Sequence, residues 1–210
     1  MAKYIGSSCR LCRREGDKLF LKGTKCATDK CAVSRRSYAP GQHGKTKMRR
    51  KDSDYNIQLR EKQKVKRIYG MLEKQFKHYF RIAQESRGVT GLKLLELLER
   101  RVDNVIFRMC LAHSRAHARQ IVQHGLVYIN SRRVDIPSCL VKVKDTVVLK
   151  PKEKTLKHHK DIFETLKDRG VPQWISFDPD KFTGTIVSLP KKADVGFPVQ
   201  EQLIVELYSK

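Results

Sequence analysis

The sequence is poor in acidic residues and has no long apolar segment. It contains 22 Asp and Glu against 45 Lys and Arg in 210 residues, a formal net charge of +23. Runs of about 18 apolar residues are absent, so no transmembrane helix is predicted. The first residues have neither the apolar core of a secretory signal nor an Arg-rich amphipathic presequence, and we therefore expect a cytosolic protein without a membrane partner.

The short motifs of common enzyme classes are also missing. GxxxxGK[ST], HExxH and GxSxG do not occur. His113 and His117 are four residues apart, but the sequence offers no third metal ligand beside them, and contact with RNA is the favoured interpretation of this pair. We therefore predict a protein that is not an enzyme and has no small-molecule substrate.

The positive charge predicts a polyanionic partner. A net charge of +23 exceeds the magnitude of about 2–8 that serves solubility, and a nucleic acid would neutralise it. Residues 1–160 contain 39 basic and 14 acidic side chains, whereas residues 161–210 contain six and eight. We expect the nucleic acid to contact the first part, and the last fifty residues to pack as core or to contact another protein.

Four of the six cysteines fall within 23 residues of one another near the N-terminus. The spacing is Cys9-x2-Cys12-x13-Cys26-x4-Cys31, which suits a tetrahedral Zn²⁺ site with a structural role. Ordinary thiols, two disulfides formed on oxidation and an iron–sulfur cluster remain alternatives. Cys110 and Cys139 stand alone, as small core residues do.

The fold class predicted is α+β with four segments. Residues 1–45 have little apolar periodicity, so we expect an arm stapled by zinc. Residues 46–91 begin with a basic linker and continue as an all-helical domain. Residues 92–150 read as two helices packed on a small antiparallel sheet, and residues 151–210 as a C-terminal helix and strands that pack back on the other domains.

Capping and turn residues predict the individual elements. Ser53 caps a helix that Gly70 separates from the next, Thr90 caps a third, and Ser114 caps a short helix that ends at Gly125. Residues 127–129 and 132–134 then form a hairpin. Two further strands are predicted at 141–143 and 146–149, followed by a helix with Leu156, Phe163 and Leu166 on one face and short strand candidates.

Basic residues gather around the two helices and the hairpin. We expect Arg101, Asn104 and Arg108 on a face turned away from the core, Arg115 and Arg119 one turn apart on the next helix, and Arg132 and Arg133 on the hairpin. The capped helix start at Ser114 adds free backbone N–H groups for a phosphate. A plain solvated basic face is the alternative, but the near absence of acidic residues between 104 and 134 favours a phosphate-binding surface. Lys157-His-His-Lys160 either adds phosphate contacts or is simply solvent-exposed.

A family resemblance supports this interpretation. Residues 114–134, SRAHARQIVQHGLVYINSRRV, closely resemble the RNA-binding module named after ribosomal protein S-four, in which a short helix and a hairpin clamp structured RNA. RNA-modifying enzymes and tyrosyl-tRNA synthetases share this module. Ser131 stands where the family's turn usually has Gly. No RRM-type aromatic motif is present, so base stacking is not predicted to be the main mode of binding.

Three other segments extend the resemblance to essentially the full chain. RSYAPGQHG at 36–44, LREKQKVKRIYG at 59–70 and PVQEQLIVELYSK at 198–210, with the four cysteines, resemble the bacterial small-subunit ribosomal protein S-four family in its zinc-binding form. The resemblance implies a ribosomal protein that binds the 5′ domain of 16S rRNA first, nucleates assembly of the body and supports decoding accuracy. It further implies contact with ribosomal protein S-five and other small-subunit proteins, and with mRNA where it enters the subunit.

The predicted RNA-binding residues combine both lines of reasoning. They are Arg10, Arg13, Arg14, Lys45, Lys47, Arg49, Arg50, Lys51, Arg101, Arg108, Ser114, Arg115, Arg119, Arg132 and Arg133. Replacing Arg115 or Arg119 by Ala is expected to weaken rRNA binding by about 1–3 kcal/mol while the fold survives.

The alternative function is that of a tRNA-directed or ribosome quality-control protein that carries the same module. A zinc-bearing DNA-binding regulator is disfavoured because no recognition helix and no dimer seam are evident.

Overall fold

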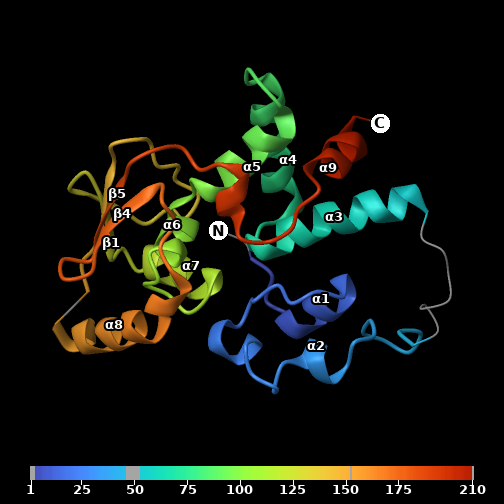
Figure 1. Cartoon of the computed structure of the whole chain (residues 1–210), viewed down its shortest axis with the longest axis horizontal. Coiled ribbons are helices and arrows are strands. Elements are labelled where there is room, and N and C mark those ends of the chain that lie inside the picture. Colours follow the sequence, from blue (N-terminus) through green and yellow to red (C-terminus); the bar gives the residue numbers. More distant parts are fainter. Residues whose placement is uncertain (1–2, 46–52, 152, 210) are drawn as a thin grey trace. The chain divides into compact units, whose positions relative to one another are not determined.

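The chain divides into two compact units in the computed structural model, which describes residues 3–45, 53–151 and 153–209. Unit 1 comprises Met1–Leu94 and Phe197–Lys210, and unit 2 comprises Leu95–Gly196 (Figure 1). The boundary lies within helix α5, Thr90–Glu99. The division differs from the four expected segments, because most of the C-terminal segment belongs to unit 2 and its last helix to unit 1.

Unit 1 is helical, as the periodicity of its apolar residues predicts. Ser53 caps its longest helix by accepting a hydrogen bond from the Asn56 N–H at 3.3 Å, and Gly70 has a φ of 63° after that helix ends. Its elements are α1 (Ser8–Glu15), the 3-10 helix η1 (Gly23–Cys26), α2 (Ala32–Arg35), α3 (Asp54–Ile68), α4 (Glu73–Glu85), the start of α5, and α9 (Glu201–Tyr208).

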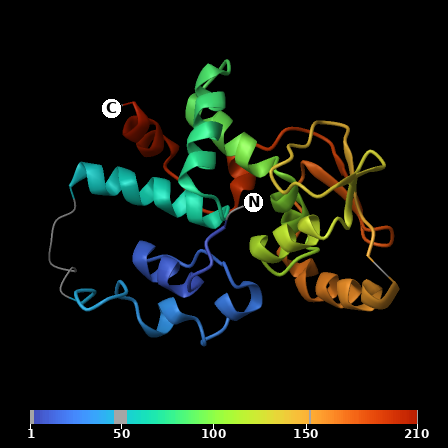
Figure 2. The same cartoon turned by 180° about the vertical axis from the view of Figure 1, so that it is seen from behind.

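The C-terminal helix α9 packs on α3, and both views show the two side by side (Figures 1 and 2). Tyr208 stacks on Phe80 with ring centroids 4.5 Å apart, and its hydroxyl donates to Glu73 at 2.8 Å. Partial burial raises the pKa of Glu73, but hydrogen bonds from Lys62, Lys66 and Tyr208 outweigh it and lower that pKa to about 2. Ile204 of α9 is buried in unit 1, and the other apolar residues of the helix are half-buried there.

A buried carboxylate joins the cysteine-bearing arm to α3. The side chain of Glu15, at the end of α1, is 1% exposed and pairs with Arg60 and Arg67. Burial raises the pKa of Glu15, while the two guanidinium groups oppose that shift. Loss of one partner of such a buried pair is costly because a charge is left uncompensated.

Unit 2 places helices against a five-stranded antiparallel sheet of order β2-β1-β3-β5-β4. Its core combines α6 and α7 with inward-facing strand residues such as Val127, Val147 and Ile186, and encloses Trp174. Its elements are α6 (Val102–Arg108), α7 (Arg115–Gln123), β1 (Val127–Ile129), β2 (Arg132–Val134), β3 (Thr146–Leu149), α8 (Glu153–Leu166), the 3-10 helix η3 (Lys167–Arg169), β4 (Ile175–Asp178), β5 (Thr183–Ile186) and the 3-10 helix η4 (Lys192–Val195).

The predicted hairpin is present, with Ile129 opposite Arg132 in the β1–β2 register. Both turn residues, Asn130 and Ser131, have positive φ values, 47° and 70°, as a type I′ turn requires. The Asn130 side chain accepts from the Thr146 N–H at 2.9 Å and donates to Asp145 at 2.7 Å. The turn is therefore fixed to the start of β3.

The expected strand at residues 141–143 is wrong. The Val141 N–H donates to the carbonyl of Arg100 at 3.0 Å, the Lys142 N–H donates to Asp145 at 2.7 Å, and Lys144 has a φ of 72°. These bonds, one to the distant Arg100 and one to the nearby Asp145, hold a loop in a segment whose alternating valines resemble a strand. None of the helices in the three described ranges has the length and apolar character needed to cross a bilayer.

Candidate nucleic-acid interface

The helix α7 begins as its sequence predicts. The Ser114 hydroxyl accepts from the His117 N–H at 3.2 Å, and the residue is 8% exposed. Replacing such a cap by Ala costs about 1 kcal/mol. The hydroxyl caps the helix and the residue is nearly buried. Ser114 therefore fixes the start of α7 and has little surface with which to contact RNA.

Three predicted polar residues do converge, but around a buried carboxylate. Glu99, fully buried, accepts two hydrogen bonds from Arg108, at 2.7 and 2.9 Å, and one from the Asn104 amide at 2.7 Å. The Asn104 oxygen accepts from Arg115 at 2.8 Å. The guanidinium of Arg115 also lies 4.4 Å from the centroid of the Phe107 ring. This network connects α5, α6 and α7.

A second buried pair lies beside it. Arg101, fully buried, donates to both oxygens of Asp103, at 2.6 and 3.0 Å. Arg119 is 5% exposed, and burial lowers its pKa, with Asp103 opposing and Arg101 reinforcing the shift. Three charged side chains are thus enclosed in the helical half of unit 2.

The expectation that Arg101 and Asn104 lie on an outward face is therefore wrong. The entire helix α6 is buried up to Arg108, and a fully buried guanidinium has no surface to offer RNA. Arg119 also lies inside, and Arg108 gives two of its bonds to Glu99 and one to the Val195 carbonyl at 2.6 Å. The sequence signal for this burial was Glu99 and Asp103, two acidic residues just before the stretch 104–134, which has none. They are the ion-pair partners of Arg108 and Arg101, respectively.

The hairpin presents two of the exposed cations of the predicted set. Arg132 and Arg133 on β2 are both exposed. Arg133 leans over Gly125, where any Cβ would collide with its guanidinium, and Gly125 has a φ of 67°. The positive φ favours Gly between α7 and β1, whereas the Arg133 guanidinium, at the end of a flexible exposed side chain, could move away from a Cβ.

Three further lysines of unit 2 are exposed, and sequence reasoning missed them. Lys142 and Lys144 lie in the loop before β3, and Lys150 follows β3. The Lys150 ammonium lies 4.6 Å from the centroid of the Tyr128 ring, which β1 and β3 hold opposite Val148. The sequence signal that could have identified these lysines was their position at the two ends of β3, next to the hairpin.

The N-terminal cations divide between internal and surface roles. Arg13 donates to the carbonyls of Tyr38 and Ala39 at 3.1 and 3.3 Å, so it fixes the arm. Arg14 is half-buried, whereas Arg10 and Lys45 are exposed. The predictions for Lys47, Arg49, Arg50 and Lys51 lie outside the described residues.

The four N-terminal cysteines line one small cavity of about 20 Å³, together with residues of η1 and α2. The Lys22 N–H donates to the Cys26 sulfur at 3.4 Å. Burial raises the pKa of Cys12, and the neighbouring Cys26, Cys9 and Cys31 raise it further. Within the described ranges, no three His, Cys, Asp or Glu side chains stand as a ready set of metal ligands.

Comparisons with known proteins agree with this architecture. Residues 3–99 match the family described as ribosomal protein S4/S9 N-terminal domain, and residues 100–147 match the S4 domain. Proteins named small ribosomal subunit protein uS4 from Trichlorobacter lovleyi, Oleidesulfovibrio alaskensis and Acetivibrio thermocellus are 56%, 55% and 53% identical, over 100% of both chains in each case. The chain belongs to the uS4 family of ribosomal proteins.

Proposed function

We propose that the chain is a structural, non-enzymatic component of the small ribosomal subunit that binds 16S rRNA. The observation that carries the proposal is the exposed pair Arg132 and Arg133 on a hairpin, in a chain that matches uS4 proteins along its whole length. RNA helices are recognised through phosphates, 2′-OH groups and shape. Arginines on a short, rigid hairpin suit that mode because their forked donors match phosphate oxygens.

The proposal extends to the finer role that the resemblance implies. In this role the chain contacts the 5′ domain of 16S rRNA and nucleates assembly of the body. It also supports decoding accuracy together with ribosomal protein S-five, and contacts mRNA where the mRNA enters the subunit. Support comes from the quoted motifs and, for mRNA, from the exposed Lys45 at the start of the basic stretch.

Binding to a transcript of the 16S 5′ domain tests this function. The full-length protein is titrated with the transcript across a salt series, with excess tRNA as competitor. We expect tight binding that survives the tRNA, with an affinity that falls steeply with salt because several counterions are released. Equal competition by tRNA would contradict the proposal and favour the tRNA-directed alternative.

We further propose that Cys9, Cys12, Cys26 and Cys31 hold a structural Zn²⁺. Their convergence on one cavity supports it, and so does the chemistry of the site: four thiolates suit Zn²⁺. Burial acts to raise the pKa of Cys31, but the backbone N–H groups of Val33 and Ser34 and the charge of Lys18 outweigh it and lower that pKa. Zn²⁺ would cross-link α1 to the N-terminus of α2.

Metal analysis of the full-length protein tests the zinc proposal. We expect one Zn²⁺ per chain, and Co²⁺ substitution with the absorption of a tetrahedral thiolate site. Replacing Cys9 and Cys12 by Ser should abolish both, whereas replacing Cys139 by Ser, as a matched control, should leave both unchanged. A protein that folds and contains no metal would contradict the proposal.

A further inference from the structure

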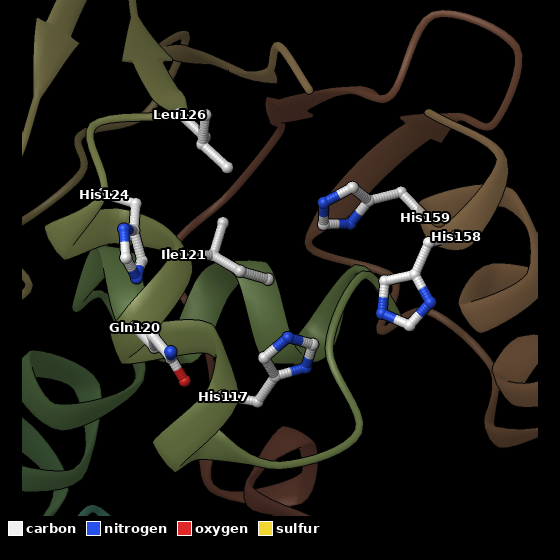
Figure 3. Close-up of a pocket in the computed structure, with 7 residues that line it drawn as sticks. All are labelled: His117, Gln120, Ile121, His124, Leu126, His158 and His159. Atoms are coloured by element: carbon white, nitrogen blue, oxygen red, sulfur yellow. The ribbon is translucent and has the colours of Figure 1, made fainter. Parts of the chain in front are cut away.

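Unit 2 has a pocket of about 310 Å³ between α7 and α8, and no residue of the β1–β2 hairpin lines it. In Figure 3 the side chains of His117 and Ile121 on α7, Leu126 after it, and His159 on α8 point toward a common space, and His158 borders it. Gln120 and His124 complete the lining. The pocket has an apolar wall and a wall of imidazole rings, a combination that suits a flat aromatic ligand.

Two of these imidazoles carry buried atoms that need a partner. His159 is 4% exposed, and in the described structure its Nδ1 and the Nδ1 of His117 are buried without hydrogen-bond partners. Buried polar atoms of native proteins nearly always have a partner. A ligand with donors and acceptors on its edge would supply one if the rings turned these atoms toward the pocket.

Burial favours the neutral state of two pocket histidines, His117 and His159, and of the neighbouring His113. Burial lowers the pKa of His117, and the neighbouring His113, His159 and His158 lower it further. Burial and His158 lower the pKa of His159, and burial, His158 and Arg169 lower that of His113. Each neutral ring offers one donor and one acceptor, which matches the edge of an uncharged heterocycle better than a phosphate.

We propose that this pocket takes one unpaired nucleobase of the RNA that the chain binds. The inference rests on the proposed function. The base would stack on the imidazole rings, a mode by which proteins hold bases that leave a helix, and would contact Ile121 and Leu126 with its face. Lys157 and Lys160 are exposed beside the two histidines of α8 and carry the charge that the adjoining phosphates require.

A metal ion fits the pocket less well. No three metal-ligating side chains of the described ranges stand in a ligand arrangement. A divalent cation would also enter a chain of net charge +23, whereas a nucleotide brings the opposite charge.

Two RNAs of equal charge test the proposal on the full-length protein. One has five abasic riboses, and the other has a single base at the central position and four abasic riboses. We expect the base-bearing RNA to bind about tenfold more tightly, as one stacked base provides, and to shift the ring signals of His117 and His159 in NMR spectra. Gln120→Trp, which fills the pocket from an exposed position, and His158→Ala should each remove most of this preference.

Matched controls isolate the pocket. Gln123→Trp alters an exposed glutamine of the same helix outside the lining, and His78→Ala removes an exposed histidine of unit 1; both should retain the preference. Equal binding of the two RNAs, or binding of neither by a protein that still binds the 5′-domain transcript, would overturn the pocket assignment and leave RNA binding intact. Failure to bind the transcript as well would overturn both. Displacement of the base-bearing RNA by Zn²⁺, with the same histidine signals shifted by the metal alone, would overturn it in favour of a metal site.

Discussion

Two arginines near the helices, Arg101 just before α6 and Arg119 in α7, lie in the same unit as those of the β1–β2 hairpin but have the opposite role. Arg101 and Arg119 are nearly or fully buried, and Arg101 is bonded to Asp103. Arg132 and Arg133 are exposed. The first group fixes the positions of the helices, and the second is available to a partner.

The difference shows that residue type and density alone do not define a binding surface. A buried guanidinium requires an anion beside it, and Glu99 and Asp103 provide anions only for the helices. The hairpin arginines have no carboxylate opposite them in the β1–β2 or β1–β3 register. An RNA phosphate can therefore act as the anionic partner of these arginines.

The largest effect is expected from a buried arginine. Arg101→Met leaves the carboxylate of Asp103 buried without its main partner, which should lower the free energy of unfolding by about 3–5 kcal/mol, measured by urea denaturation. Arg132→Met, the same change on the exposed hairpin, should alter it by less than about 0.5 kcal/mol. Equal stability of the two variants would show that burial does not distinguish the role of Arg101 from that of Arg132.

The double substitution Arg132→Ala/Arg133→Ala should weaken binding to the 5′-domain transcript. We expect a loss of about 1–3 kcal/mol per arginine and a shallower salt dependence, by about two counterions, with the unfolding transition unchanged. Lys167→Ala/Lys181→Ala removes the same charge from two exposed positions and should have a smaller effect. An equal loss of affinity in both variants would show that the hairpin arginines contribute only through the overall positive charge of the protein.

The expectation for Arg119→Ala changes with its buried position. The substitution should lower stability as well as affinity, so it does not isolate an RNA contact. Arg115→Ala removes the bond to Asn104, and its effect on RNA should be separated from its effect on folding by measuring affinity well below the unfolding temperature.

The turn of the hairpin provides a smaller stabilising change. Ser131 has a φ of 70°, a conformation that costs a side chain about 1–2 kcal/mol, and Gly adopts it freely at some entropic cost. Ser131→Gly should therefore raise the free energy of unfolding by about 0.5–1 kcal/mol. Unchanged or lower stability in urea would contradict this reading of the turn.

The smallest effect is a pH dependence from the histidines between α7 and α8. Burial lowers the pKa of His113, His117 and His159, so the unfolded chain binds protons more readily than the folded one. Their contribution to stability is complete above their ordinary pKa near 6.5 and is lost as pH falls through the lower folded values. The melting temperature should fall between pH 7.5 and 5, and less in His117→Gln/His159→Gln.

Short-range signals predicted most of unit 1 and the start of the RNA-binding module. Ser53 and Ser114 are predictable as caps because each hydroxyl accepts from an N–H group only three residues away. Gly125 and the Asn130 turn follow from local conformational limits. These features depend on neighbours in sequence, which is why the sequence alone was enough.

Features that depend on distant partners were missed. The strand expected at 141–143 failed because Arg100 and Asp145 take its hydrogen bonds. The burial of Arg101 could not be read from a helical wheel, since the residue precedes α6 and pairs with Asp103 inside the core. Likewise, nothing local indicates that the last helix packs on α3 or that its Tyr208 stacks on Phe80 of α4.

The position of α9 has a consequence for synthesis on the ribosome. Unit 2 is continuous in sequence, from Leu95 to Gly196, whereas unit 1 needs residues from both ends of the chain. Because a growing chain emerges N-terminus first, the middle of this protein can complete its fold before the beginning can. A nascent chain that stops short of Phe197 would carry a finished RNA-binding module on an unfinished helical unit.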